Sequence, residues 1–530
     1  MRNVRNLTVF AASVAALISG SALAQAQADL VVSTGGGEVR GFAKQDVENF
    51  FGIPYAAPPK GDLRWKAPQP PAFWNEVRDA TNYGAACPQA EGLDSVRTTD
   101  EDCLFVNVQR PAGAKENDKL PVVVLIHGGG WKTGSGNNEN LNAIVSGSKV
   151  VGVTMNYRLG HLGSFPHPAL EENGDAGNYG ILDQQAALRW VKDNIAKFGG
   201  DPEQVTVGGE SAGGGSACQL LAAPSANGLY SRAFMMSTPC DAIPKETAEK
   251  TGLEAAKALG CEGDDAAACL RALPVDAFID AKNVFSRPVS GTTFLPKSGW
   301  ELMKEGTFPK VPVLIGGNRD EGRSFLTDWE SRSVKTWDEE GYEKLVRDTY
   351  GKDADAVLSV YSWPENADRY TGTYLAAEVM MANRSPEGGL SACKTNQITD
   401  RLQQQGSQVW AYEFAPANGP GWFEIPGYVW GTGHAVELPY LIPDRGNFAN
   451  NGKALSADHK KLSDTMLAYW GAFIRAGNPA AEGQPEWPAY KTEGGPVMTL
   501  RENDKSAALP AVAFRSRHHC DLWDTIANRK

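Results

Sequence analysis

Short apolar runs recur along the chain, and most of them are apolar at nearly every position rather than at alternate ones. Strands that are covered on both faces have this character, because both rows of their side chains are buried. The runs that fit best are rich in β-branched residues and cover residues 121–127, 149–156, 204–208, 232–237, 311–315 and 408–414. The pattern therefore predicts a largely parallel sheet inside the protein.

Helical spacing lies between these runs. In residues 184–198, apolar side chains recur every three or four positions, for example at Leu188, Val191 and Ile195. This spacing predicts a helix that packs on the sheet. Strands that alternate with helices and glycine-rich turns are typical of the α/β class. Because no repeat, low-complexity tract or Pro/Ser-rich linker divides the chain, we expect one large domain over residues 25–530, although that length exceeds the usual domain size.

The composition limits which functions the chain can have. The 530 residues are 42% hydrophobic and 22% charged, which is typical of a globular chain and excludes disorder over most of it. Asp and Glu outnumber Lys and Arg by 63 to 51, so the net charge is −12. A nucleic-acid backbone would be repelled by this charge, and we expect no nucleic-acid partner. After residue 30 no apolar run approaches the roughly 20 residues that cross a bilayer.

The N-terminus is typical of a secretory signal peptide. Two arginines precede an apolar stretch over residues 7–17, and small residues in an Ala-x-Ala register follow. We expect residues 1–24 to form the signal, with cleavage after Ala24 or Ala26, and the mature protein to be secreted or periplasmic. The alternative, an uncleaved membrane anchor, is disfavoured because the apolar stretch is short and rich in alanine.

Eight cysteines fit such an oxidising compartment, where disulfides persist. No Cys-x-x-Cys pair is present, and the compact cluster His518-His519-Cys520 lacks a second pair of ligands nearby. We therefore expect neither a metal site nor a cofactor, but a chain end held by a disulfide. Eight cysteines allow 105 pairings, and their spacing alone does not choose among them.

A serine in a glycine-rich turn is the first candidate for chemistry. Gly209-Glu210-Ser211-Ala212-Gly213 lies between the predicted strand 204–208 and an apolar stretch typical of a helix. A serine on a tight strand-to-helix turn has a strained backbone that exposes its hydroxyl, and the helix start directs amides toward negative charge that forms beside it. The motif alone is weak, but in this context it makes Ser211 a candidate nucleophile.

Three glycines follow the predicted strand 121–127. Gly128, Gly129 and Gly130 leave backbone N–H groups uncovered by side chains, which suits the stabilisation of an oxyanion. The alternatives are a flexible turn and a phosphate-binding loop. Lys132-Thr133 has the wrong spacing for the latter.

A serine hydroxyl needs a base at neutral pH. Hydrolases with this kind of turn have the chain order serine, acid, histidine. The loop after strand 311–315 offers Asp320 and Glu321 at the carboxyl end of a strand, where the ligand sites of α/β proteins gather. Of the histidines beyond this loop, His434 lies in a glycine-flanked segment before an apolar run, whereas the others lie in a charged segment or near the chain end. We therefore predict His434 as the base and Asp320 or Glu321 as the acid.

Together these motifs resemble the type-B carboxylesterases, a family that includes the cholinesterases. The resemblance spans nearly the whole mature chain. It is carried by residues 51–59 (FGIPYAAPP), 101–108 (EDCLFVNV), 156–160 (NYRLG), 177–184 (GNYGILDQ), 198–202 (FGGDP), 209–214 (GESAGG), 320–322 (DEG), 434–439 (HAVELP), 477–479 (GNP) and 487–488 (WP). It implies an α/β-hydrolase fold with a large, mostly parallel central sheet, helices on both faces and long insertions.

The resemblance also implies roles for single residues. Ser211 would be the nucleophile, His434 the general base, and Glu321 rather than Asp320 the acid of a catalytic triad. The amides of an oxyanion hole would come from Gly129, Gly130 and Ala212. The implied disulfides join Cys87 to Cys103, Cys261 to Cys269 and Cys393 to Cys520. No partner is implied for Cys218 or Cys240, which we expect to be buried free thiols.

The expected function is that of a secreted serine carboxylesterase acting on small-molecule esters. The alternatives are a lipase or an amidase with the same triad, and a binding or surface module with residual hydrolysis. Because the stretch between Cys87 and Cys103 lacks the tryptophan with which cholinesterases hold a quaternary ammonium, choline esters are not expected substrates. Arg319, Arg323 and the aromatic residues within 421–430 are candidates for substrate contacts; the alternatives are solvated arginines and a packed core.

Overall fold

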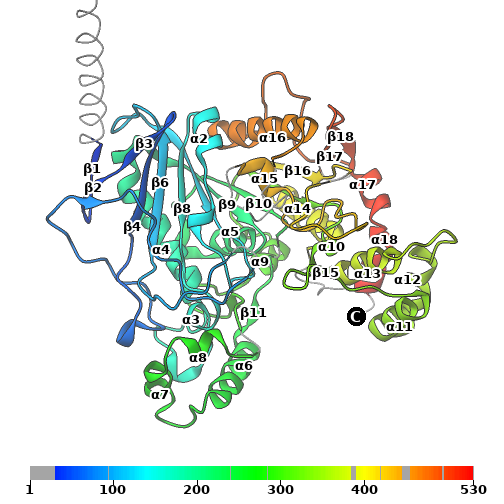
Figure 1. Cartoon of the computed structure of the whole chain (residues 1–530), viewed down its shortest axis with the longest axis horizontal. Coiled ribbons are helices and arrows are strands. Elements are labelled where there is room, and N and C mark those ends of the chain that lie inside the picture. The colour runs from blue at the N-terminus through cyan, green and yellow to red at the C-terminus, as the bar shows by residue number, and fades with distance from the viewer. Residues whose placement is uncertain are drawn as a thin grey trace, which may run out of the picture.

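The computed structural model describes residues 30–92, 95–238, 240–282, 285–382, 390–417, 419–443, 454–491 and 494–528. The expected signal segment, residues 1–24, lies outside these residues. An 11-stranded sheet crosses the molecule, from N-terminal strands at one end to C-terminal strands at the other (Figure 1). In spatial order its strands are β18 (Ala507–Pro510), β17 (Pro496–Leu500), β16 (Val409–Phe414), β13 (Val313–Asn318), β10 (Arg232–Met236), β9 (Gly200–Glu210), β7 (Leu120–Ile126), β8 (Val151–Met155), β6 (Phe105–Pro111), β4 (Val47–Pro54) and β3 (Phe42–Lys44).

The sheet is mixed, with a parallel centre and antiparallel ends. From β8 to β17 every neighbouring pair is parallel, and these strands include all six that were predicted. The strands β3, β4, β6 and β18 pair antiparallel. The prediction missed β6 because polar residues interrupt its apolar run. Two of them, Asn107 and Gln109, are buried and bond to neighbouring polar side chains, Asn107 to Thr154 at 3.1 Å.

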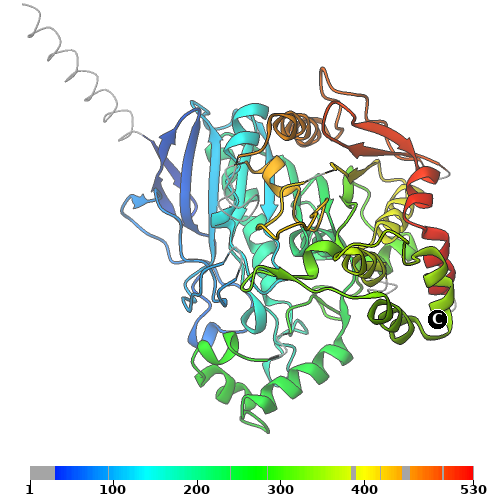
Figure 2. The ribbon, with the colours of Figure 1, turned by 45° about the vertical axis from the view of Figure 1, so that its right-hand side comes forward.

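Hydrophobic packing covers both faces of the sheet, because successive residues of a strand point to opposite sides. On one face Val122 and Val124 of β7 share a core with α4 and α5, and on the other Val123 and Leu125 share a core with α2 and α16. Figure 2 shows helices along the sheet from a second direction. These helices are α4 (Tyr179–Asn194), α5 (Ala212–Ala222), α2 (Asn142–Ser148) and α16 (Ala457–Ala476). The predicted helix 184–198 is confirmed as α4 and the 3-10 turn Ile195–Phe198.

The remaining elements project from the sheet or close its ends. At the foot of Figure 1 lie α6 (Lys245–Ala258), α7 (Ala266–Ala272) and α8 (Asp276–Ile279), near α3 (Gly160–Gly163). The other helices are α9 (Gly299–Glu305), α10 (Gly322–Phe325), α11 (Glu339–Tyr350), α12 (Ala354–Val360), α13 (Thr371–Ala382), α14 (Ala392–Gln404), α15 (Leu438–Leu441), α17 (Ala511–Arg517) and α18 (Cys520–Asn528). Small sheets are formed by β1 (Val31–Thr34), β2 (Gly37–Arg40) and β5 (Arg78–Asp79), by β11 (Ile243–Pro244) and β12 (Val289–Ser290), and by β14 (Thr327–Asp328) and β15 (Ser333–Val334). Within the described ranges, no helix is both long and apolar enough to cross a membrane.

All eight cysteines are paired. The structure has the three disulfides that the resemblance implied, Cys87–Cys103, Cys261–Cys269 and Cys393–Cys520. It also joins Cys218 to Cys240, so the prediction of two free thiols is wrong. Cys218 lies in α5, and Cys240 follows β10, which neighbours β9 in the sheet. Because α5 starts at the end of β9, the fold brings together two cysteines that lie 22 residues apart.

Candidate active site

Ser211 lies on the sharp turn between β9 and α5. Its backbone has φ +57° and ψ −122°, a conformation that residues with a side chain rarely adopt. The turn is held on both sides, because the Ser211 amide donates to Met236 O at 3.0 Å and the Ser211 carbonyl accepts from Gly215 N at 2.9 Å. The residue is only half-buried, so a substrate can reach it. Backbone strain at an accessible serine is a feature of nucleophile turns.

Glycines allow the chain to pack closely around this turn. The carbonyl oxygen of Ile126, at the end of β7, occupies the space that a side chain at Gly209 or Gly213 would need. Only glycine can therefore stand at these positions without moving β7 away. The close packing also brings the glycine loop to the serine: a Cβ atom placed on Gly128 would lie 3.3 Å from Cβ of Ser211.

His434 and Glu321 are in direct contact. Nδ1 of His434 lies 2.6 Å from Oε2 of Glu321, and both side chains are buried. The other carboxylate oxygen of Glu321 accepts from the Ser237 hydroxyl at 2.5 Å and from Asn318 N at 2.7 Å. These donors fix the carboxylate, so Glu321 can orient the imidazole ring and stabilise its protonated form.

Asp320, the alternative acid, faces a different partner. Its carboxylate accepts from Thr432 N at 2.9 Å and from the Thr432 hydroxyl at 3.0 Å, and it pairs with Arg319 and Arg323. Although burial would raise the pKa of Asp320, Arg323 and Arg319 hold it below its usual value. Asp320 therefore ties the acid loop to the histidine loop, whereas Glu321 reaches the histidine itself.

Backbone bonds strengthen this tie between the two loops. The His434 amide donates to Glu321 O at 3.2 Å, and the Ser324 hydroxyl donates to His434 O at 3.1 Å. The side chain of Asn318 donates to Gly433 O at 2.8 Å. The position of His434 is thus set by the same loop that carries its acid, although 113 residues separate His434 from Glu321.

Two further carboxylates surround the imidazole, and the sequence reasoning missed both. Oε1 of Glu210 lies 3.1 Å from Nε2 of His434, and buried Glu437 accepts from the Asn318 side chain. In the described chain the Ser211 hydroxyl makes no hydrogen bond, and Nε2 of His434 faces Glu210, the neighbour of Ser211 in sequence. The signal that was available is the variable position of the Gly-x-Ser-x-Gly motif, where a carboxylate stands directly before the nucleophile.

These carboxylates change the ionisation of the site. Burial alone would lower the pKa of His434, but Glu210 and Glu321 outweigh this effect and raise the pKa to about 9. Burial, together with Glu210 and Glu321, raises the pKa of Glu437 to about 8. The surrounding carboxylates therefore favour the protonated imidazole, and burial beside them favours the neutral form of Glu437.

The carbonyl groups of Gly128 and Gly129 are each held by hydrogen bonds within the glycine loop region. Gly128 O accepts from Nδ1 of His127 at 2.8 Å, and Gly129 O accepts from the amides of Lys132 and Thr133 at 3.0 and 3.1 Å. Because the C=O and N–H of a trans peptide point in opposite directions, these bonds fix where the amides of Gly129 and Gly130 point. Both glycines are exposed residues.

The other substrate-contact candidates have structural partners. Arg319 and Arg323 pair with Asp320, and Arg323 also donates to Val429 O at 3.1 Å. The aromatic residues of 421–430 pack mainly on one another, in a cluster that contains Phe423, Tyr428 and Trp430. By contrast, the ring of Phe325 is partly exposed, with its centroid 4.8 Å from that of His434. Phe325 is therefore an aromatic side chain that lies against the site.

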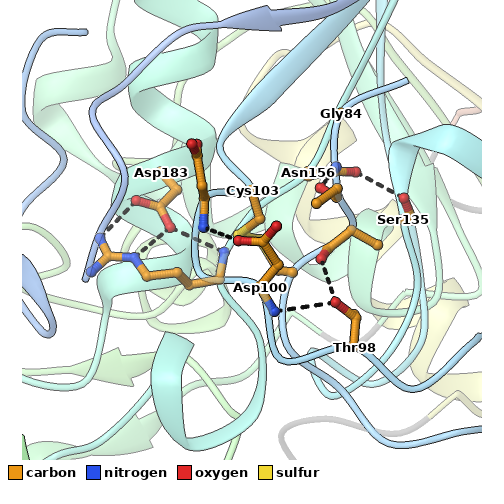
Figure 3. Close-up of a disulfide and its surroundings, with 12 residues drawn as sticks. Gly84, Thr98, Asp100, Cys103, Ser135, Asn156 and Asp183 are labelled. Carbon is orange, nitrogen blue, oxygen red and sulfur yellow. Dashed lines mark hydrogen bonds and ion pairs between the residues drawn. A yellow bond between two sulfur atoms is a disulfide. The ribbon is translucent and has the colours of Figure 1, made fainter. Parts of the chain in front are cut away.

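The Cys87–Cys103 disulfide lies beside Asn156, which holds the chain just after the glycine loop. Figure 3 shows this region between a buried ion pair, Arg158–Asp183 with atoms 2.7 Å apart, and the hydrogen bond from Ser135 to Asn156 at 2.9 Å. Asn156 also accepts from Gly136 N at 2.9 Å. The chain just after the glycine loop is thus fixed to the carboxyl end of β8.

In the described ranges, no group of three or more His, Cys, Asp or Glu could hold a metal ion.

Comparison with known proteins gives a consistent result. The profile of the Carboxylesterase family matches residues 28–523. The para-nitrobenzyl esterase of Bacillus subtilis (strain 168) is 35% identical over 513 residues, which are 92% of this chain and 99% of that protein. The fumonisin B1 esterase of Sphingopyxis macrogoltabida is 35% identical over 500 residues, 89% of this chain and 86% of that protein. A crystal structure of a Geobacillus stearothermophilus carboxylesterase superimposes with a TM-score of 0.78 at 29% identity, covering 93% of this chain and all of that one.

Proposed function

The chain belongs to the carboxylesterase family and is a carboxylic ester hydrolase of the α/β-hydrolase fold, and from this premise we propose that it acts through an acyl-enzyme on Ser211. His434 is the base and Glu321 the acid of a Ser-His-Glu triad. The observation that carries the proposal is the 2.6 Å contact between His434 Nδ1 and Glu321 Oε2, with the other imidazole nitrogen beside the turn that carries Ser211.

In the first step the Ser211 oxygen attacks the ester carbonyl while Nε2 of His434 takes the hydroxyl proton. To do so, the hydroxyl rotates toward Nε2 and replaces Glu210 as its partner; catalytic hydrogen bonds often tighten only when substrate is bound. The carbonyl oxygen becomes an oxyanion. The amides of Gly129, Gly130 and Ala212 stabilise it, since the first two are exposed and the third begins α5.

In the second step the tetrahedral intermediate collapses and the alcohol leaves with the proton of His434. Water then attacks the acyl-enzyme, again giving its proton to Nε2, and the acid is released. Glu321 stabilises the imidazolium that forms twice in each cycle. Ser237 and Asn318, which bond to Glu321, hold its carboxylate in place.

The remaining parts of the proposal concern where the enzyme acts and how it is organised. Residues 1–24 form a secretory signal, and residues 25–530 form one domain that acts in the periplasm or outside the cell. Four disulfides within the described chain support an oxidising compartment. Its substrates are small-molecule esters, and the two arginines of the acid loop pair with Asp320.

The test uses Ser211→Ala and His434→Ala, assayed on para-nitrobenzyl acetate, with Ser225→Ala as the control because Ser225 is exposed beyond the end of α5. We expect each triad variant to lose at least about 1,000-fold in kcat, and the double variant little more, because the groups act as a unit. Circular dichroism verifies folding. Near-normal rates in either triad variant would refute the assignment.

Covalent labelling distinguishes a serine hydrolase from a binding module on the same fold. An organophosphate should modify Ser211 in the wild type, detected by peptide mass spectrometry, because only an activated hydroxyl reacts quickly. A binding module would leave Ser211 unlabelled. Ester panels with increasing acyl length, and the matching anilides, then distinguish an esterase from a lipase, which would prefer long chains, and from an amidase.

A further inference from the structure

The buried side chain of Gln89 bonds to both backbone groups of Gly134, a residue just after the glycine loop. Its Oε1 accepts from Gly134 N at 2.8 Å, and its Nε2 donates to Gly134 O at 2.9 Å. A side-chain amide that pairs with both groups of one residue fixes that residue in position and in orientation. Gln89 belongs to the loop closed by the Cys87–Cys103 disulfide and is not adjacent in sequence to any residue of the triad.

Gly134 in turn supports the start of the glycine loop. Its φ is +108°, and a side chain at this position would collide with Nδ1 of His127 and with the carbonyl oxygen of Gly128. The backbone of Gly134 therefore lies directly against these two groups. A shift of Gly134 would open space behind them.

The His127 ring and the Gly128 carbonyl set the direction of the Gly129 amide, one of the proposed oxyanion-hole donors. His127 Nδ1 donates to Gly128 O at 2.8 Å, and Gly128 O belongs to the same peptide as the Gly129 amide. The His127 ring is itself fixed, since it stacks on Tyr157 with centroids 4.3 Å apart. When the carbonyl is held on one side of a trans peptide, the N–H points to the other. The direction of the Gly129 amide thus depends on the space that Gly134 fills.

We propose that Gln89 is a positioning residue of the oxyanion hole, acting through Gly134, His127 and the Gly128 carbonyl on the Gly129 amide. The proposal rests on the proposed function, because it assumes that this amide binds the oxyanion. A preorganised donor lowers the barrier only if it already points to where the negative charge will form. Loss of Gln89 should therefore weaken binding of the transition state more than binding of the ester.

Other contacts keep the disulfide loop in place when the amide of Gln89 is removed. The disulfide closes the loop, and the backbones of Gln89 and Thr98 bond to each other in both directions, at 3.0 and 3.1 Å. The Asn156 side chain donates to Ala85 O at 2.9 Å and accepts from Ser135. Figure 3 shows Thr98, Asn156 and Ser135 around the disulfide. A Gln89 variant thus removes only the contacts of its side-chain amide, two with Gly134 and one from Nε2 to Cys87 O at 3.0 Å, while the disulfide loop stays closed.

The test compares Gln89→Leu and Gln89→Glu with the wild type. Leucine removes both bonds to Gly134 and the bond to Cys87 O, whereas glutamate keeps the acceptor for Gly134 N and loses the donor to Gly134 O and Cys87 O. Ser95→Ala is the matched control, because its hydroxyl bonds within the same loop, to Ala90 O, and does not contact Gly134. Thiol titration verifies that all disulfides remain intact, and thermal unfolding verifies that the variants fold.

Two measurements report on the oxyanion hole. The first is kcat and KM on para-nitrobenzyl acetate. The second is the inhibition constant of an alkyl trifluoromethyl ketone, in which the Ser211 oxygen bonds to the carbonyl carbon, His434 takes the proton and the ketone oxygen becomes an oxyanion. The matching methyl ketone, which adds to serine far less readily, reports on ground-state binding.

We expect Gln89→Leu to lower kcat by about 10- to 100-fold and to weaken the trifluoromethyl ketone by a similar factor, less than the full loss of a donor. KM and the methyl ketone should change less than threefold, and Gln89→Glu should fall in between. Equal losses for both ketones, or unchanged kcat in a folded Gln89→Leu enzyme, would overturn the proposal. Failure of the proposed function is seen separately, as retained activity in Ser211→Ala.

Discussion

The carboxylate of Glu210 lies 3.1 Å from Nε2 of His434, on the side of the imidazole opposite to Glu321. The base of the proposed triad therefore lies between two acidic side chains, one of which immediately precedes the nucleophile. Such an arrangement stabilises the imidazolium that forms during the reaction. It also stabilises it in the resting enzyme, where the base must be neutral to accept a proton.

The first prediction concerns the pH dependence of activity. Because the pKa of His434 is raised to about 9, kcat/KM should rise with pH and reach half of its maximum near pH 9. Glu210→Gln removes one of the two carboxylates that chiefly raise the pKa of His434, so its midpoint should lie at least about one pH unit lower. The measurement is a pH–rate profile on a para-nitrobenzyl ester, corrected for spontaneous hydrolysis.

A control variant in β9, the strand that also carries Glu210, shows whether the shift of the midpoint is specific to Glu210. Glu203→Gln removes an exposed carboxylate of β9 and should leave the midpoint unchanged. A wild-type midpoint between pH 6 and 7 that does not move in Glu210→Gln would contradict the role of Glu210.

The second prediction concerns stability. The native pKa values of Glu437, about 8, and His434, about 9, lie above the ordinary values of 4.5 and 6.5. The native state therefore binds more protons than the unfolded state between about pH 4.5 and 9, so the free energy of unfolding falls as pH rises through this window. At about 1.4 kcal/mol for each pKa unit, the two differences together give a loss on the order of 8 kcal/mol.

Glu437→Gln tests this linkage. Glutamine cannot ionise but can still accept from Asn318, so the fall in stability between pH 4.5 and 8 should become shallower. Urea unfolding at several pH values measures it, with the exposed Glu482→Gln as the control. An identical slope in Glu437→Gln and wild type would show that Glu437 is ionised at neutral pH.

The third prediction separates the two carboxylates of the acid loop. Glu321→Gln removes the acceptor that orients His434, so kcat should fall by about 1,000- to 10,000-fold. Asp320→Asn leaves that contact intact and weakens the tie to Thr432, so kcat should fall by about tenfold or less and the melting temperature should drop. Steady-state kinetics and thermal unfolding measure both. A larger loss of kcat in Asp320→Asn than in Glu321→Gln would reverse the assignment.

The centre of the fold could be predicted from sequence because its signal is local. The parallel strands are continuous apolar runs, as in β7 and β13, and burial on both faces leaves no other pattern. The antiparallel strand β6 carries Asn107 and Gln109, whose burial is possible only because distant side chains bond to them. Such partners are absent from any local window of sequence, so β6 was missed.

The same distinction applies to the site. The turn of Ser211 and the glycine-flanked position of His434 are local features, and the structure brings their loops together. The contact of Glu210 with His434 and the disulfide Cys218–Cys240 depend on how distant segments dock onto β9 and α5. Motif spacing does not contain that geometry. Choosing Glu321 over Asp320 likewise needed either a family resemblance or coordinates, because both are carboxylates of one loop.

The last prediction compares two disulfides that close loops of very different length. Cys393–Cys520 spans 127 residues and Cys261–Cys269 spans 8. If a disulfide stabilises mainly by restricting the unfolded chain, the longer loop contributes about 5 kcal/mol and the shorter about 2.5 kcal/mol. Replacing both cysteines of each pair by serine and measuring guanidinium unfolding should reproduce this order. Equal losses in the two double variants would show that native-state contacts, such as the packing of α18 on α14, outweigh the effect on the unfolded chain.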